Sequence, residues 1–336
     1  MGFAERLKKM LNMSNDDGNR IIITGALGYI GSHTAVELIE AGFEVCLVDN
    51  LSCTNIEVLE GIEKITDVKP IYENIDCKDY VAMDKFMNKV GGIKAVIHCA
   101  ALKNEENSDN NPLAYYRNNI GSLVTLLELL PVHKINCLVC SVPMAANQDS
   151  VYHSSLLMCE RIINDSMKVN HDLYCTIVHH ATAIGAHPTS LVGFNGERGD
   201  LQIDISRAAA GKCENVAVYE NHIREYIDIM DIAKTHRHII ENIGSQKDRM
   251  LKQNLGSGCC LSDIEFVKLF EQINNVRISM DVRVPENNSE QQVVSSNGAN
   301  SEKLKEAIKN IWRWQLHLGD IESDGKQKSG HLLGGS

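Results

Sequence analysis

The chain has 336 residues, of which 43% are apolar and 23% charged, with a formal net charge of −11 at pH 7. This length and composition allow a sizeable buried core and exclude a disordered or fibrous chain. The negative charge argues against a nucleic-acid binder, because phosphate contacts need a basic face. The eleven cysteines are scattered, mostly inside apolar runs. We expect buried, reduced thiols and a cytoplasmic protein.

Neither end of the chain carries a targeting signal that we can identify. Residues 1–18 lack the apolar segment of a signal peptide and are expected to form a frayed N-terminal extension. The Gly/Ser-rich segment 319–336 is expected to be a disordered tail. No apolar stretch is long enough to span a bilayer, so we expect no membrane partner.

From residue 19 onward, short apolar runs alternate with helical patterns. The expected strands are Ile21–Gly25, Val45–Asn50, Ala95–Leu102, Cys137–Val142 and Cys175–Ala181. This alternation predicts an α/β fold, a Rossmann-type doubly wound parallel sheet over residues 19–181. Beyond 182 the pattern loosens, with predicted helices at Leu201–Gly211, Asp231–Ile243, Leu261–Ile273 and Ser301–Trp314. We expect a smaller C-terminal α/β substrate domain over 182–318, with part of the chain returning to the first domain.

The strongest local motif is a glycine-rich turn between the first strand and the following helix. Gly25, Gly28 and Gly31 have the spacing that allows a tight turn, close approach of a pyrophosphate and helix packing, with Tyr29 and Ile30 beginning the helix. Asp49 ends the next strand, where a carboxylate accepts from ribose hydroxyls and repels a 2′-phosphate. The pattern predicts an NAD site, and a purely structural turn is the lesser alternative.

The segment TGALGYIGSHTAVELIEAGFEVCLVDNLS resembles the start of UDP-glucose 4-epimerase, an extended short-chain dehydrogenase/reductase, in its fungal form. The resemblance continues through AVIHCAALK (95–103), PLAYYRNNIGSLVTLLELL (112–130), IGAHPTS (184–190), REYIDIMDIAKTH (224–236), NLGSG (254–258) and WRWQ (312–315). It implies an NAD-dependent isomerase of galactose metabolism that removes a hydride from C4 of a UDP-sugar and returns it to the other face. Further residues implied near NAD are Asn50, Asp76 (displaced by one position), Lys103 and Asn119.

The sequence departs from this family where the chemistry is done. The family uses Tyr-x3-Lys, which places both side chains on one helical face, and a Ser or Thr on the preceding strand. Here Tyr152 remains, but Leu156 replaces the Lys, and Val142 and Met144 stand at the hydroxyl positions. A tyrosine with the ordinary pKa of about 10 is phenolate in only about one molecule in a thousand at neutral pH. By strand alternation, Ser141 is expected to face away from Val142.

The substrate side also departs from the pattern that the resemblance implies. Thr182 and Arg224 match substrate-binding positions, Arg224 at the diphosphate of a UDP-sugar, and Gly199-Asp200 replaces a pair of asparagines. A second diphosphate-binding Arg has no counterpart, because no Arg lies between Arg283 and Arg313. The histidines and cysteines match no compact zinc pattern, so we predict no metal site.

Two helical segments, 119–130 and 156–167, are apolar on one face. The resemblance implies that these helices form a homodimer interface, whereas burial against the chain's own sheet is the alternative. Within the second segment, Glu160 and Arg161 are expected to be a solvated pair.

Three hypotheses follow for function. The first is an NAD-binding, catalytically inactive epimerase homologue, a pseudoenzyme that acts by binding or regulation, with an unidentified protein partner and weakened NAD affinity. The second is an active UDP-glucose/UDP-galactose 4-epimerase or related enzyme with rearranged catalytic residues. The third is a structural interaction protein that keeps only the fold.

Overall fold

The computed structural model describes residues 18–103, 105–144, 150–194, 196, 199–220, 222–243, 245, 247–284 and 302–331. The expected N-terminal extension therefore lies almost wholly outside the described residues. The chain divides into two compact units. Unit 1 contains the chain up to His180 together with Asp231–Leu255, and unit 2 contains Ala181–Met230 and the chain from Gly256 onward.

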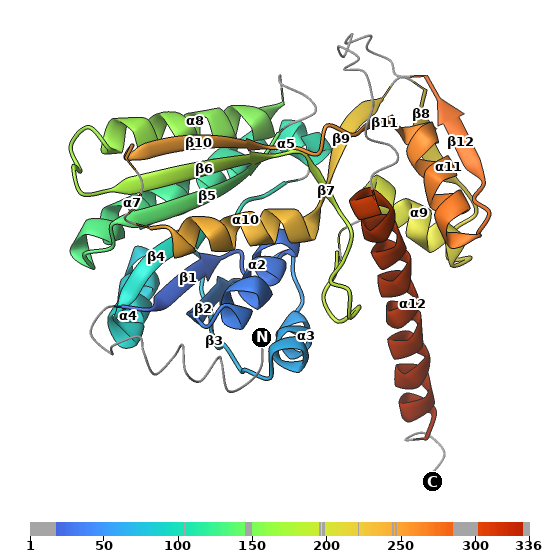
Figure 1. Cartoon of the computed structure of the whole chain (residues 1–336), viewed down its shortest axis with the longest axis horizontal. Coiled ribbons are helices and arrows are strands. Elements are labelled where there is room, and N and C mark those ends of the chain that lie inside the picture. Colours follow the sequence, from blue (N-terminus) through green and yellow to red (C-terminus); the bar gives the residue numbers. More distant parts are fainter. Residues whose placement is uncertain are drawn as a thin grey trace. The chain divides into compact units, whose positions relative to one another are not determined.

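Unit 1 is built on a seven-stranded parallel sheet (Figure 1). In spatial order its strands are β10 (Met250–Leu255), β6 (Tyr174–His180), β5 (Cys137–Pro143), β4 (Ile93–His98), β1 (Arg20–Thr24), β2 (Glu44–Asp49) and β3 (Ile71–Asn74). The central strands are almost continuously buried, as expected for a parallel sheet covered on both faces. The predicted doubly wound α/β fold is confirmed.

Helices cover both faces of this sheet. Those of unit 1 are α2 (Tyr29–Glu40), α3 (Val58–Thr66), α4 (Tyr80–Val90), α5 (Glu105–Asn110), α6 (Pro112–Tyr115), the π-helix η1 (Tyr116–Ile120), α7 (Gly121–Val132), α8 (Val151–Ser166) and most of α10 (Ile229–Glu241). Apolar residues of α4, α7 and α8 form one core with the strands. On α2 and α10, Thr34 Oγ1 lies 2.9 Å from His236 Nδ1, and Arg237 Nη1 donates to Glu37 Oε2 at 2.9 Å.

The strand order reverses between β1 and β4. From β1 the chain moves outward through β2 and β3, and from β4 it moves the other way through β5 and β6. The carboxyl ends of β1 and β4 therefore diverge at a topological switch point, which is where open α/β sheets bind ligands. The glycine-rich turn lies at this point.

The described residues of unit 2 form two small sheets and three helices. The sheets are β11 (Cys260–Ser262), β9 (Ile223–Asp228) and β7 (Thr182–Ile184), and β12 (Met280–Arg283) with β8 (Val216–Tyr219). The helices are α9 (Leu201–Ala209), α11 (Asp263–Asn274) and α12 (Glu302–His331). Tyr226, Phe266 and Phe270 belong to a core of its own.

Two sequence-based boundaries differ from the structure. The helix expected at Leu261–Ile273 is preceded by β11, because a capping box in which Ser262 and Glu265 bond to each other starts α11 only at Asp263. The last helix continues to His331, well beyond the expected end of order at residue 318. No helix among the described residues is both long and apolar enough to cross a membrane.

Candidate functional site

The glycine-rich turn joins β1 to α2 with glycines at the two tightest points. Gly25 has φ +62°, and a Cβ there would lie 2.7 Å from Ala100 Cα. A Cβ on Gly31 would lie 2.3 Å from the carbonyl oxygen of Gly25. Gly28 is the N-cap of α2 and supplies no side-chain cap, with Tyr29 and Ile30 beginning the helix. A glycine turn that leads into a helix N-terminus is the arrangement in which dinucleotide-binding folds hold a pyrophosphate, through backbone amides and the helix dipole.

Asp49 ends β2 and is buried beside this turn. Its Oδ2 accepts from Leu27 N at 3.0 Å, and its Oδ1 accepts from Leu51 N at 2.9 Å and Thr54 Oγ1 at 2.7 Å. A carboxylate accepts about four hydrogen bonds. Asp49 therefore ties the turn to the end of β2 and keeps acceptor capacity for a ribose hydroxyl.

Three further predicted cofactor residues lie on loops after the carboxyl ends of strands. Asn50 follows β2 and accepts from Ser52 N at 3.1 Å. Asp76 follows β3 and pairs with Lys78 at 3.3 Å. Lys103 follows β4 and lies near enough to Asp49 for their charges to interact. These side chains are at the edge of the sheet where the glycine turn lies.

The side-chain amide of Asn119, a predicted cofactor residue, is fully hydrogen-bonded within the protein. Its Oδ1 accepts from Leu102 N and Asn118 Nδ2, and its Nδ2 donates to Leu102 O and Ser155 Oγ. These four bonds use the whole hydrogen-bonding capacity of the side chain. Asn119 therefore holds the loop after β4 against α8.

The sequence reasoning missed His98, which ends β4 at the switch point. Its Nδ1 lies 2.7 Å from Thr24 Oγ1 at the end of β1. Burial lowers the pKa of His98 to about 4, so its imidazole is neutral at physiological pH. The sequence around His98 is an apolar strand and does not indicate a site. Its partner Thr24 is 74 residues away along the chain, so only the fold brings the two together.

Tyr152 lies in the first turn of α8, which is held by three caps. Ser150 Oγ accepts from His153 N, Asp109 Oδ1 accepts from Val151 N, and Ser108 Oγ accepts from Tyr152 N. The Tyr152 side chain is buried in an apolar cluster with Tyr115 and Leu156, against which Leu102, Val142 and Val151 pack. The helix spacing thus brings Tyr152 and Leu156 together in hydrocarbon surroundings.

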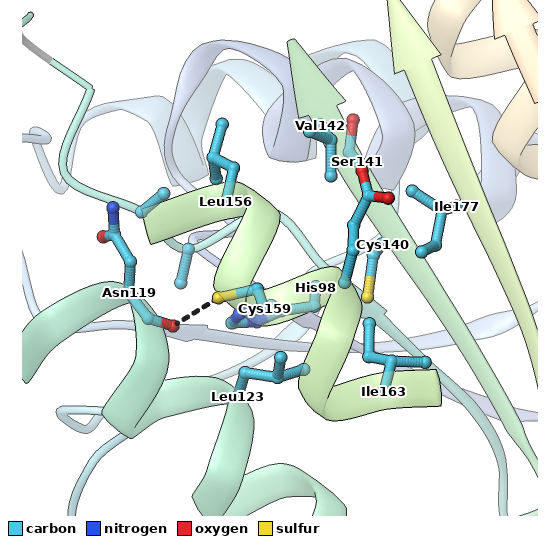
Figure 2. Close-up of a pocket in the computed structure, with 13 residues that line it drawn as sticks. His98, Asn119, Leu123, Cys140, Ser141, Val142, Leu156, Cys159, Ile163 and Ile177 are labelled. Carbon is cyan, nitrogen blue, oxygen red and sulfur yellow. Dashed lines mark hydrogen bonds between the residues drawn. The ribbon is translucent and has the colours of Figure 1, made fainter. Parts of the chain in front are cut away.

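A small cavity lies beside Leu156 (Figure 2). Its volume is about 30 Å³, room for one or two water molecules. The lining comes mainly from β4, β5, η1, α7, α8 and β6: His98, Ala100, Ala101, Asn119, Leu123, Cys140, Ser141, Val142, Leu156, Cys159, Glu160, Ile163 and Ile177. Ser141 and Val142, consecutive residues of β5, are both among the lining residues, and the Ser141 hydroxyl is buried with no partner among the described residues.

Glu160 was expected to form a solvated pair with Arg161, and this prediction was wrong. Glu160 Oε1 lies 2.5 Å from His179 Nε2, and Glu160 Oε2 lies 2.6 Å from Lys252 Nζ. Arg161 instead pairs with Asp165 at 2.7 Å. Burial opposes ionisation of Glu160, but the bonds to Lys252 and His179 outweigh it and lower the pKa of the carboxyl.

In unit 2 the predicted substrate residues Thr182 and Arg224 lie on adjacent strands of one sheet. Thr182 on β7 is paired with Tyr226 on β9, two residues beyond Arg224. Arg224 is half-buried, and its guanidinium contacts the ring of His222. Within the part of the chain that the structure describes, no group of three or more His, Cys, Asp or Glu side chains is placed to hold a metal ion.

The fold and the turn define a dinucleotide-binding protein of the Rossmann type, and comparison with known proteins gives the family. Residues 21–251 match the NAD dependent epimerase/dehydratase family, and the chain belongs to it. A UDP-glucose 4-epimerase of Dictyostelium discoideum is 30% identical, with the match covering 88% of this chain and 96% of the relative.

The solved structures agree with this membership. The UDP-glucose 4-epimerase of Stenotrophomonas maltophila, solved with bound NAD and formylated UDP-arabinopyranose, superposes with a TM-score of 0.82 at 26% identity. The alignment covers 90% of this chain and 99% of that one. The enzyme of Bifidobacterium longum, in complex with NAD+ and UDP, has a TM-score of 0.80 at 24% identity, covering 89% of this chain and 98% of that one, and shares the fold.

Proposed function

We propose that this chain is an NAD-binding relative of UDP-glucose 4-epimerase that has lost the epimerase reaction and acts by binding or regulation. The observation that carries the proposal is the environment of Tyr152. Its ring packs against Leu156, one helical turn away, in an apolar cluster that also contacts Val142. No cation stands at the Leu156 position to stabilise a phenolate.

The residues around the switch point fit NAD. Gly25 and Gly31 let the turn pack closely against Ala100 and the Gly25 carbonyl at the start of α2, where a pyrophosphate would bind, and Asp49 keeps acceptor capacity for a ribose. Asn50, Asp76 and Lys103 are further candidates at the same edge. Bound NAD would supply hydride transfer, whereas Tyr152 would have to move the proton of the sugar hydroxyl. Without Lys at 156, a hold on the nicotinamide ribose is also missing, so we expect weaker NAD binding.

Two other functions remain candidates. An active epimerase or related sugar-nucleotide enzyme with rearranged residues is favoured by Ser141, a cavity-lining residue whose buried hydroxyl has no partner among the described residues. A structural interaction protein that keeps only the fold would bind neither NAD nor a UDP-sugar. Cofactor binding separates this last candidate from the other two, because the glycines are also required by the close backbone contacts of the turn itself.

The proposal includes a cytoplasmic homodimer that pairs through residues 119–130 and 156–167, with a further protein partner whose identity is open. Leu157 and Met158 on α8 are 52% and 46% exposed, and α7 lies against α8. Exposed side chains of this size on one helix suit association with a second copy.

The proposal is tested by measuring cofactor and turnover on the same preparation. The bound NAD is first reduced chemically to NADH. The protein is then denatured, and the released NADH is read at 340 nm. We expect cofactor to be released and a coupled UDP-galactose to UDP-glucose assay to give negligible turnover. Gly31→Val should abolish the release of NADH, because the valine side chain would clash with the carbonyl oxygen of Gly25 and distort the turn. Absence of bound NAD at saturating cofactor supports the structural candidate, and turnover like that of an ordinary epimerase refutes the proposed loss.

A further inference from the structure

Unit 2 contains a chain of three polar side chains that ends at Arg224. Arg224 Nε donates to His222 Nε2 at 3.2 Å, and Arg224 Nη2 lies 3.1 Å from His222 Nδ1. His222 Nδ1 lies 3.4 Å from Asp263 Oδ2. Asp263 is 2% exposed, and its Oδ2 also accepts from Tyr219 N at 3.2 Å.

The backbone holds this arrangement in place. Arg224 on β9 is paired with Leu261 on β11 in an antiparallel register, and Asp263 follows directly after β11. Asp263 N donates to His222 O at 3.1 Å, which extends the antiparallel pairing of the two strands by one residue pair. The imidazole therefore contacts the guanidinium through both ring nitrogens, and its Nδ1 also lies beside a buried carboxylate.

His222 contacts the Nε–Nη2 edge of the Arg224 guanidinium, which is an edge that can bind an anion. A guanidinium binds a phosphate through two parallel N–H···O hydrogen bonds, and the Nε–Nη2 edge can form one such bidentate pair. Here the ring of His222 lies across that edge. A neutral imidazole that accepts from Nε at Nε2 carries its proton on Nδ1 and can donate it to Asp263, so the ring blocks Nη2 by position and not by accepting from it.

The charge around Arg224 is also compensated. Asp263 supplies a buried negative charge through His222, and Asp200 lies close enough to Arg224 for their charges to interact. Asp200 is fixed there because it is the N-cap of α9, where it accepts from Gln202 N at 3.0 Å. A doubly charged diphosphate entering this region would meet two carboxylates and one engaged cation.

We propose that His222, backed by Asp263, closes the phosphate-binding edge of Arg224 and makes unit 2 reject nucleoside diphosphates. This inference rests on the proposed function, because it concerns the same sugar-nucleotide site, and it names the ligand class that the site excludes. His222 is a specificity-determining residue in this arrangement, because it keeps the Nε–Nη2 edge of Arg224 from binding a phosphate.

The test is isothermal titration of the full-length protein with UDP and with inorganic pyrophosphate. His222→Ala should raise the affinity for both by about tenfold or more, since a charge-assisted bidentate contact becomes available. Adding Arg224→Gln to His222→Ala should remove the gain. His171→Ala, which deletes an exposed histidine of unit 1, should leave UDP binding as in the wild type.

Two results would overturn the inference: no gain in UDP affinity in a folded His222→Ala, or a gain that survives Arg224→Gln. If His222→Ala does not fold, Asp263→Asn replaces it, and no gain there is equally decisive. NAD titration of the same samples separates the two proposals. Loss of NAD binding refutes the proposed function alone, whereas tight UDP binding without turnover refutes this inference alone.

Discussion

At the scale of single residues, the proposal depends on a few side chains around Tyr152. Leu156 is 7% exposed and packs beside Tyr152, and Val142 lines the same cavity. A leucine there stabilises the core by burial, about 1.5–3 kcal/mol for a side chain of this size. The same side chain supplies neither a charge nor a hydrogen bond, so stability and catalysis make opposite demands on one position.

Restoring the missing groups should restore part of the reaction. We expect Leu156→Lys combined with Val142→Ser to raise epimerase turnover by about 10²-fold or more, because each acid–base group contributes about 10²–10⁴. The coupled UDP-galactose assay measures this. Val169→Lys with Val142→Ser is the matched control, since residue 169 is 82% exposed after α8 and its charge lies away from Tyr152. No gain in a folded, NAD-loaded double variant would mean that other site residues limit the reaction.

At the scale of elements, α8 has two roles on two faces. One face carries Tyr152, Leu156 and Ile163 into the core, and the other presents Leu157 and Met158. The exposed pair is the part of the helix that suits a partner copy.

Leu157→Glu should therefore weaken self-association by at least about tenfold, because a charge would be buried in an apolar interface. Sedimentation equilibrium at micromolar concentration measures the effect. Val169→Glu places the same charge at an 82% exposed position after the helix and should change nothing. A monomeric wild type would contradict the expected homodimer.

The sequence predicted those features that depend on the spacing of neighbouring residues, and it did not predict contacts between residues far apart in the chain. The parallel sheet, the glycine turn and the placement of Tyr152 and Leu156 on one face follow from spacing along the chain. The partners of Glu160 do not, because Lys252 is 92 residues away on the edge strand β10. His98 and the His222–Asp263 contact were missed for the same reason: each depends on which strand ends meet, and only the fold shows that.

At the scale of the whole molecule, buried neutral histidines link stability to pH. Burial lowers the pKa of His98 to about 4 and that of His236 to about 3, from an ordinary 6.5. Below pH 6.5 the unfolded chain binds protons that the folded chain refuses, so stability falls with pH down to about pH 4 for His98 and 3 for His236.

At pH 5 each of these histidines should cost about 2 kcal/mol of unfolding free energy relative to pH 7. Urea denaturation at pH 7, 6 and 5 measures this dependence. His98→Gln and His236→Gln should each flatten it by about that amount, whatever they do to absolute stability. His171→Gln, at an exposed position, should keep the wild-type slope. An unchanged slope in both buried variants would mean that other groups control acid unfolding.

The most direct measurement is the steady-state conversion of UDP-galactose to UDP-glucose by the purified chain at saturating NAD. The Dictyostelium discoideum relative serves as the side-by-side standard. Loss of both the Lys and the strand hydroxyl predicts turnover at least about 10⁴-fold below that standard, since each group contributes about 10²-fold or more. Turnover within about tenfold of the standard would contradict the proposal that this protein has lost the epimerase reaction.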